Sequence, residues 1–431
     1  MEKVFIVSLG CSKNLADAEE MLGLLAHKKF KIVPSEKEAD VILINTCAFI
    51  KPARVEAGRE IRRAARLKAA GKIKKIIVSG CLTQKEGAIL PRKYPAVDAF
   101  IGLSEIDKID RIIRTPVHCF NPVPRMLKAP KYKMRLTAPH SAYLKVADGC
   151  SNCCAYCTIP SIRGPFRSKP VKDIVAEARA LASSGVKEIS LIAQDTTAYG
   201  QDIYGKPSLV KLLRELVKIK PVKWWRIMYA YPETVTEDLL KFIATHKSIA
   251  RYIDMPLQHI SDDILKAMNR RSGSAEIKQK IAMLRRYVPD MGLRTNFIAG
   301  FPGETDEDFE KLKKFIAEIK FNNVGVFAYS KEDGTAAASI KNQIPQKIKL
   351  ARAAELTAAQ SRVVDGINKK LKNKTVSIML DARESGRMEY DAPDIDGRVR
   401  IINNKKYKPG DIVKAKIISA AGYQRTAKIL P

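Results

Sequence analysis

Apolar runs alternate with amphipathic stretches over the first quarter of the chain. Residues 4–7, 41–44 and 76–78 are short runs rich in Val and Ile, as buried strands are. Between them, residues 16–27 and 51–70 place apolar side chains three and four positions apart, which is the spacing of an amphipathic helix. Strands that alternate with helices predict a parallel α/β sheet, and we expect it to form an N-terminal domain over residues 1–114.

Prolines interrupt this pattern before it resumes. Five prolines between residues 115 and 139, among scattered basic residues, predict an irregular linker. Strand-like runs then recur, with helical stretches at residues 171–184, 209–218, 261–269 and 307–318 between them. The runs occupy residues 143–146, 188–192, 225–228, 252–255, 294–298 and 324–328. These units predict a barrel or partial TIM-like barrel over residues 140–367, with its chemistry at the carboxyl ends of the strands.

The end of the chain changes its hydrophobic period. A helical run over residues 348–371 closes the central domain, and residues 376–380, 399–402 and 412–418 then alternate apolar with polar. We expect turns at residues 384–386, 396–397 and 408–411, where Gly, Asp, Pro and Ser gather. Short strands at this spacing predict a small antiparallel, OB-like β-barrel over residues 368–431.

The charge of the chain is strongly unbalanced, with 77 Lys and Arg against 46 Asp and Glu and a formal net charge of +31. Such an excess favours a polyanionic partner, above all RNA or an RNA-rich particle, unless the source proteome is Lys-rich in general. No apolar run is long enough to span a membrane, and the N-terminus has the pattern of a strand rather than a signal peptide. We therefore expect a cytoplasmic protein with no membrane partner, whose cysteines serve metal or redox chemistry.

Three cysteines in one loop form the most specific motif. Cys150, Cys154 and Cys157 are spaced C-x3-C-x2-C, with Tyr156 directly before the last. Three thiolates can hold three irons of a 4Fe-4S cluster, which leaves the fourth iron open to a small molecule. A zinc knuckle is the alternative, but zinc takes four ligands and no nearby Cys or His supplies the fourth. The spacing resembles that of the radical S-adenosylmethionine superfamily, whose members cleave this cofactor reductively to form a radical.

Three further cysteines follow the N-terminal strands. Cys11, Cys47 and Cys81 each come directly after one of the three apolar runs. Because ligands of an open parallel sheet bind beyond the carboxyl ends of its strands, these thiols can meet at one point. We predict a second three-thiolate 4Fe-4S cluster there, rather than three small buried cysteines, and its open iron can carry a sulfur atom awaiting transfer.

Nearly the whole chain resembles the methylthiotransferase family, in which a three-cysteine domain, a radical barrel and a TRAM domain follow one another. The resemblance implies insertion of sulfur into a C–H bond as a methylthio group, with two 4Fe-4S clusters and two molecules of S-adenosylmethionine. Residues 8–15, 192–200, 255–262 and 391–397 resemble the branch called RimO. That branch acts on the β-carbon of an aspartate in small-subunit ribosomal protein twelve. The implied partners are this protein, free or on the ribosomal particle with rRNA contact, and an electron donor such as a flavodoxin or ferredoxin.

The tRNA-modifying branch, called MiaB, is the alternative within the family. It usually has Gln-Met-Asn after its first cysteine, where residues 12–14 are Ser-Lys-Asn, and Ser-Gly-Ser where residues 259–261 are His-Ile-Ser. The basic residues after Asn368 favour it instead, with a modified adenosine next to the anticodon as substrate. A non-catalytic RNA-binding protein with structural clusters is a third hypothesis. It predicts irons with four protein ligands, which neither cysteine set provides.

Beyond the cluster ligands we expect no catalytic residues, but several contacts to S-adenosylmethionine. Tyr156, beside Cys157, is expected near the adenine. Gln194 and Asp195 follow a barrel strand and are expected to hold the methionine part. The alternatives are a packing aromatic for Tyr156 and an ordinary capped turn for the other two.

Three more candidate contacts are assigned in the same way. Gln258 follows another barrel strand and is expected near the ribose. Gly303 and Glu304 belong to a segment that resembles the superfamily's glycine-containing segment beside the adenine, where glycine permits close backbone approach. We interpret Cys153 as a thiol that does not bind the cluster, although its spacing from Cys150 allows a second register, and Cys119 fits no motif.

Overall fold

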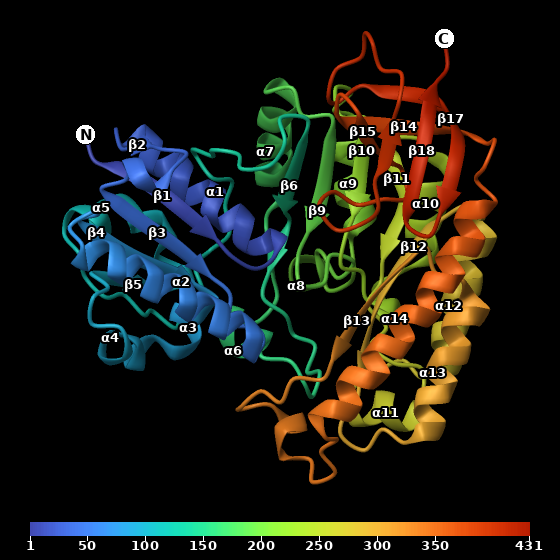
Figure 1. Cartoon of the computed structure of the whole chain (residues 1–431), viewed down its shortest axis with the longest axis horizontal. Helices are drawn as coiled ribbons and strands as arrows, with labels where there is room; N and C mark the ends of the chain where they lie inside the picture. The colour runs from blue at the N-terminus through green and yellow to red at the C-terminus, as the bar shows by residue number, and fades with distance from the viewer.

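The computed structural model describes residues 1–431, and Figure 1 shows a central sheet between an N-terminal sheet and a terminal barrel. The N-terminal sheet is parallel, with strand order β2-β1-β3-β4-β5. Its strands are β1 (Lys3–Ser8), β2 (Lys31–Ile32), β3 (Val41–Thr46), β4 (Lys75–Gly80) and β5 (Ala99–Ile101). Its helices are α1 (Ser12–His27), α2 (Lys51–Ala69), α3 (Cys81–Glu86), α4 (Leu90–Lys93) and α5 (Ile109–Arg114). The predicted parallel α/β domain is therefore confirmed.

Both faces of this sheet are buried, because alternate residues of β3 enter different cores. Ile42 and Ile44 pack with α2 on one face, whereas Val41 and Leu43 pack with α1 and α5 on the other. A strand buried on both faces must be apolar throughout, which explains the continuous run in the sequence. This burial fixes β3 at the centre of the sheet, between β1 and β4.

The proline-rich segment between α5 and β6 (Ser141–Lys145) contains no helix or named strand. This segment packs against the N-terminal domain. Cys119 forms an isolated parallel bridge with Ile101 of β5, and Met134 donates its backbone N–H to Glu19 O at 3.0 Å. The segment thus connects the two sheets while lying against α1.

The central sheet consists of six parallel strands in the order β13-β12-β11-β10-β9-β6, and it stays open between β13 and β6. This arrangement confirms the predicted partial barrel. Beside β6, its strands are β9 (Glu188–Ile192), β10 (Trp224–Ile227), β11 (Ile249–Asp254), β12 (Gly292–Ala299) and β13 (Asn323–Ala328). Its helices are α7 (Val171–Ser183), α8 (Gln201–Tyr204), α9 (Leu209–Leu216), α10 (Glu237–Thr245), α11 (Asp262–Ala267), α12 (Ser274–Tyr287), α13 (Asp306–Ile319) and α14 (Gln346–Lys369). None of the helices is both long and apolar enough to cross a membrane.

A closed five-stranded barrel ends the chain, in the order β14-β15-β16-β18-β17. Its strands are β14 (Thr375–Ala382), β15 (Ser385–Met388), β16 (Val399–Ile401), β17 (Ile412–Ala421) and β18 (Gln424–Ile429). All neighbouring strands are antiparallel except β16 and β18, which are parallel. The turn expected at residues 384–386 is shorter than predicted, because β15 already begins at Ser385. A Cβ on Gly386 would lie 2.4 Å from Met379 O, so the glycine here permits close strand pairing.

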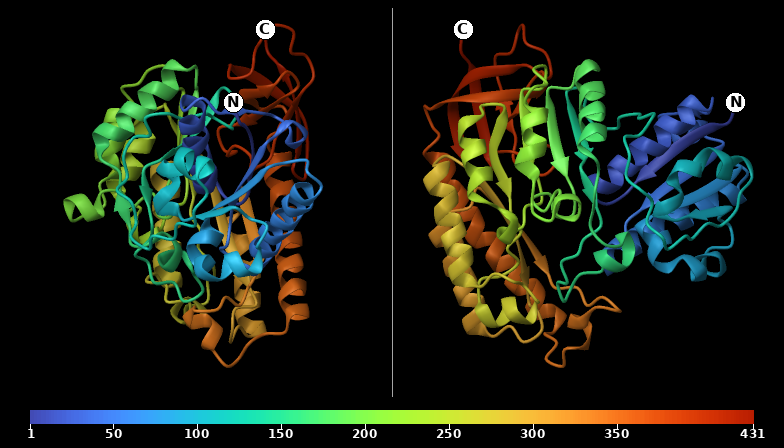
Figure 2. Two further views of the ribbon diagram at one scale, coloured as in Figure 1. Left: turned by 90° about the vertical axis from the view of Figure 1, so that its left-hand side faces the viewer. Right: turned by 180° about the vertical axis from the view of Figure 1, so that it is seen from behind.

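The terminal barrel packs on the inner face of the central sheet (Figure 2). Glu188, at the start of β9, is fully buried and accepts hydrogen bonds at 2.7 Å from Arg226 of β10 and from Arg387 of β15. Asp396 accepts a hydrogen bond from Tyr252 at 2.9 Å. Ala392, in the same loop, is completely buried beside the inner face of the sheet. We propose domain limits at residues 114, 139 and 367, the last of which falls inside α14.

Candidate functional site: two three-cysteine sets at a domain interface

The N-terminal cysteines lie at the carboxyl ends of three adjacent strands, β1, β3 and β4. Cys11 occupies the N-cap position of α1 without a side-chain capping hydrogen bond, Cys47 follows Thr46, and Cys81 is the first residue of α3. Gly10 has a φ of +91°, and a Cβ there would lie 2.7 Å from Cys47 Cβ. Glycine is therefore required for this close approach of the two loops.

The electrostatics of these three thiols differ. Burial raises the pKa of the Cys81 thiol to about 12, although the charge of Arg163 opposes this. Burial also raises the pKa of Cys47. At Cys11 burial acts in the same direction but is outweighed, so its pKa lies below the usual value. The charges of Lys13 and Arg163, together with backbone N–H groups in the first turn of α1, favour that thiolate.

The barrel cysteines lie in the loop between β7 (Ala147–Asp148) and α6 (Ile159–Arg163). Burial is the main cause that raises the pKa of Cys150 to about 11 and that of Cys157 to about 12. Repulsion between the sulfur charges of this loop adds to both shifts. Cys153 is solvent-exposed, and its Sγ lies 3.8 Å from Ser151 O.

The donor chemistry of each set fits a 4Fe-4S cluster. Each set offers three thiols, which would bind the irons of a cluster as thiolates. In neither set do three side chains gather tightly enough to ligate a single metal ion. Cys81 Sγ lies 3.7 Å from Asn14 Oδ1, in the first turn after Cys11, and a Cβ on Gly10 would lie 3.2 Å from Cys47 Sγ, so the loops that carry the three N-terminal thiols come together.

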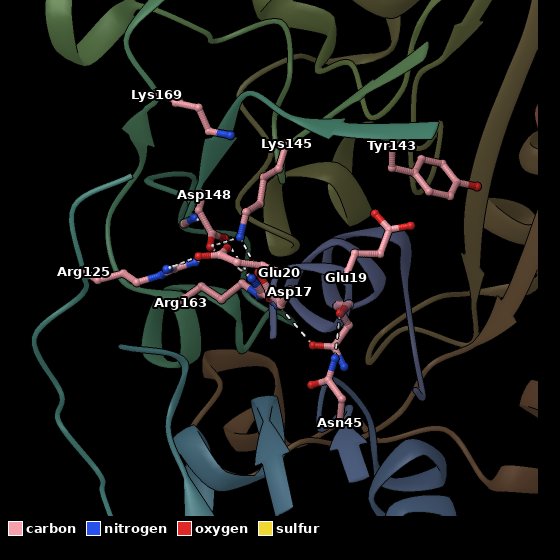
Figure 3. A network of polar contacts seen from close by, with 12 residues as sticks. Asp17, Glu19, Glu20, Asn45, Arg125, Tyr143, Lys145, Asp148, Arg163 and Lys169 are labelled. Atoms are coloured by element: carbon pink, nitrogen blue, oxygen red, sulfur yellow. Dashed lines mark hydrogen bonds and ion pairs between the residues drawn. The ribbon is translucent and has the colours of Figure 1, made fainter. Parts of the chain in front are cut away.

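Arg163 of α6 extends from the segment after the barrel cysteines to the N-terminal site, and Figure 3 shows it beside Asp17 and Asp148. Its guanidinium donates to both carboxylate oxygens of Asp148, at 3.0 and 3.1 Å, and to Asp17 of α1 at 2.9 Å. The same group lies 3.6 Å from Cys81 Sγ and 3.2 Å from Asn14 Oδ1. Arg163 follows Cys157 by six residues, so one buried side chain joins the barrel loop to the N-terminal site.

Further ion pairs hold α1 against the central domain and the proline-rich segment. Lys145 of β6 pairs with Asp17. Arg125 donates two hydrogen bonds of 2.6 Å to Glu20, a bidentate geometry that fixes orientation. Lys133 pairs with Glu19 at 3.3 Å. Three carboxylates of one helix are therefore neutralised by cations from other segments, and they set the position of α1 (Figure 3).

Gln194 and Asp195 lie side by side after β9 but differ in their partners. Both polar side-chain atoms of Gln194 are buried without a hydrogen-bond partner. Such atoms call for a partner that is not part of the protein. Asp195, in contrast, accepts hydrogen bonds from Asn152 at 3.0 Å and from the Ala198 N–H at 3.1 Å. Because Asn152 belongs to the cysteine loop, Asp195 anchors that loop to the end of β9.

The other candidate contacts lie at the same end of the sheet. Gln258 has a left-handed φ of +73°, and its backbone N–H donates a hydrogen bond to Asn296 O at 2.8 Å. Tyr156 packs in one apolar cluster with Phe301, so the cysteine loop touches the segment that contains Gly303. Gly303 is exposed, and a Cβ at this position would meet no atom within 4 Å.

Glu304 is buried, and its carboxylate is fully engaged within the protein. It accepts hydrogen bonds from the Gly300 N–H at 2.9 Å and from Arg352 at 2.7 Å. His259 lies 3.4 Å from the same carboxylate. Glu304 therefore stabilises the turn after β12.

Sequence reasoning missed the cations and aromatic residues around these loops. Arg270 stacks on Tyr231, with 3.9 Å between the guanidinium carbon and the ring centroid, and lies 3.8 Å from Cys154 Sγ. Tyr229 has a left-handed φ of +60° and bonds to Ser12 Oγ at 3.1 Å. A lone Arg or Tyr outside a motif gives no sequence signal, because its role depends on contacts distant in the chain.

Comparison with known proteins agrees with this division of the chain. Residues 3–102 match the uncharacterized protein family UPF0004, residues 144–316 the radical SAM superfamily, and residues 374–430 the TRAM domain. Ribosomal protein uS12 methylthiotransferase RimO of Elusimicrobium minutum is 70% identical over 430 residues, which cover 100% of both chains. The RimO protein of Geobacter sulfurreducens is 42% identical, covering 100% of this chain and 99% of its own.

This chain belongs to the RimO family. The expected methylthiotransferase family and its ribosomal branch are thereby confirmed, as is the radical S-adenosylmethionine class of enzyme. Among solved structures, the radical S-adenosylmethionine methyltransferase TsrM of Kitasatospora setae is similar with a TM-score of 0.58 and 11% identity. The match covers 85% of this chain and 90% of that one, and at this identity it concerns the fold alone.

Arg163→Met tests whether this buried guanidinium holds the N-terminal and central domains together. We expect the free energy of unfolding to fall by about 3–5 kcal/mol, because Asp148 and Asp17 lose a buried partner. Arg163→Lys should recover part of the loss, since it keeps the charge but not the bidentate geometry. Anaerobic denaturant titration measures the change. The exposed Arg362→Met is the control, and an equal effect of both Met variants would contradict the role of Arg163.

Proposed function

We propose that this chain adds a methylthio group to the β-carbon of an aspartate in uS12, the small-subunit ribosomal protein twelve. The observation that carries the proposal is the position of Arg163, which follows Cys157 by six residues and lies 3.6 Å from Cys81 Sγ, so the barrel cysteine loop leads directly to the N-terminal cysteine site. Membership of the RimO family supplies the substrate class. A ribosomal substrate places the proposed reaction in the cytoplasm.

The cysteines are proposed to hold two 4Fe-4S clusters. Cys150, Cys154 and Cys157 would bind one, and the set at the ends of β1, β3 and β4 would bind the other. When bound, these groups supply the reductive cleavage of one S-adenosylmethionine and the sulfur that is inserted, while a second S-adenosylmethionine supplies the methyl group. The chain itself fixes the two loops relative to each other through α6. We also propose a flavodoxin or ferredoxin as electron donor, which should sustain turnover in place of a chemical reductant.

The carboxyl end of the central sheet is proposed to bind S-adenosylmethionine. The unpartnered amide of Gln194 suits the charged methionine part, and Arg270 supplies a cation beside Cys154. Tyr156 and Gln258 are proposed to contact the nucleoside. Asp195 holds the cysteine loop, and Gly303 and Glu304 shape the neighbouring turn.

Gln194→Leu should weaken equilibrium binding of S-adenosylmethionine, because it removes the amide that is proposed to meet the methionine part. Unchanged binding would argue against this placement.

The terminal barrel is proposed to contact ribosomal RNA. Lys416 of β17 and Lys428 of β18 are exposed and lie directly opposite each other. Like charges in this position destabilise a sheet unless an anion lies over them. RNA phosphates are such anions, and each neutralised phosphate releases counterions. The lysine pair therefore favours a substrate that is presented with its RNA.

The decisive experiment compares cells with and without the gene by mass spectrometry. A methylthio-sized mass should disappear from one aspartate-containing peptide of uS12, while the tRNA nucleosides of the same culture stay unchanged. Restoring the gene should restore the mass. Loss of a methylthiolated adenosine, with uS12 unchanged, would instead support the tRNA alternative.

Iron analysis tests the two cluster assignments. The Cys150→Ala, Cys154→Ala, Cys157→Ala triple variant should keep roughly half of the iron and lose cleavage of S-adenosylmethionine. Replacing the three N-terminal cysteines should also halve the iron but leave that cleavage intact. Cys153→Ser is the matched control, since its thiol is exposed, and it should keep all of the iron. Loss of half the iron in Cys153→Ser would show that the other register holds.

Salt dependence tests the proposed RNA contact. The Lys416→Gln, Lys428→Gln variant should bind small-subunit particles more weakly, and the slope of log affinity against log salt should fall by about two. Lys278→Gln with Lys311→Gln removes the same charge from exposed helix positions of α12 and α13 and serves as control. Equal slopes for the two double variants would refute an RNA contact at β17 and β18.

A further inference from the structure

Lys13 is a nearly buried lysine without a carboxylate partner. It is the second residue of α1, two positions after Cys11, and only 8% of it is exposed. Its ammonium lies over the Tyr229 ring, 3.2 Å from the centroid. It forms no ion pair, although nearly every other buried cation of this interface does. The ammonium keeps some contact with solvent, so it offers an unpaired positive charge that a ligand can reach.

Tyr229 holds this ammonium at the carboxyl end of the central sheet. The residue follows β10, and its left-handed φ of +60° is unusual for a bulky side chain. Two contacts fix it there: its hydroxyl bonds to Ser12 Oγ at 3.1 Å, and its carbonyl accepts from the Thr196 N–H at 2.9 Å. Strained residues that are fixed in this way cluster at functional sites.

The charged groups around Lys13 leave its ammonium without an ion pair. Asp254, at the end of β11, is the carboxylate near enough for the charge of Lys13 to act on it. Its Oδ1 lies 3.7 Å from Arg294 Nε and accepts no hydrogen bond, and no pairing with Lys13 occurs. On its other side lies Cys11, two positions earlier in the chain, whose thiolate the charges of both Lys13 and Arg163 favour. Lys13 therefore lies between the N-terminal thiols and the strand ends of the central sheet.

We propose that Lys13 binds the side-chain carboxylate of the aspartate that is modified. This proposal rests on the function proposed above and names the group that recognises its substrate. The β-carbon of aspartate is bonded directly to the carboxylate carbon, so a cation that holds the carboxylate also fixes the carbon that receives sulfur. An ammonium has three donors for this purpose. The position two residues after Cys11 puts this contact on the side of the sulfur-bearing set, whereas Arg270 lies beside the barrel cysteines.

The test compares two peptides that span the target aspartate of uS12, one with Asp and one with Asn at that position. Anaerobically reconstituted wild-type chain should bind the Asp peptide about tenfold or more tightly than the Asn peptide, as expected for a hydrogen bond to a charged group. Lys13→Met should bind both peptides equally. Iron content and cleavage of S-adenosylmethionine without peptide report separately on whether the clusters are intact.

Lys13→Arg keeps the charge in a longer and planar group, and it provides a second measure. It should retain the preference for Asp, but it should form less methylthio product per S-adenosylmethionine cleaved, because the β-carbon is displaced. Persistence of the Asp preference in Lys13→Met, or its loss in Lys13→Arg, would overturn the assignment while leaving the proposed function intact. A wild-type chain that binds and modifies neither peptide nor uS12 would overturn both.

Discussion

The position of the N-terminal sheet relative to the central sheet depends on buried ion pairs, with the guanidinium of Arg163 at their centre. Arg163 lies between Asp17 and Asp148 and touches Cys81, so a single side chain contacts both domains and one of the proposed cluster ligands. Taking these charges out of water is expensive, and the cost is offset only when all of them are paired. The interface is therefore either fully formed or strongly destabilised. This property keeps the two three-cysteine sites at a constant distance from each other.

The elements that carry the cysteines could be predicted because their signals are local. The apolar runs before Cys11, Cys47 and Cys81 show which strands end at the site, and the parallel topology then brings these ends together. The contacts between the domains could not be predicted. Arg163 and Asp17 are 146 positions apart in the chain, and nothing in a lone arginine indicates its partner.

The same reasoning explains where the details of the prediction were incomplete. The pairing of β16 with β18 is parallel, although alternating short strands favour an antiparallel barrel. A cross-over of this kind depends on how the barrel closes, which the period of the strands does not encode. Gln258 and Tyr229 adopt left-handed backbone conformations that a sequence marks only when the residue is glycine.

The loop that contains Ala392 and Asp396 anchors the terminal barrel within the concave face of the central sheet. A terminal barrel packed in this way cannot move freely relative to the central domain. A partner bound to the terminal barrel is therefore held at a fixed distance and orientation relative to the carboxyl ends of the central strands. Selectivity for a single residue of a large particle can then arise from the dimensions of the enzyme, in addition to the chemistry of its site.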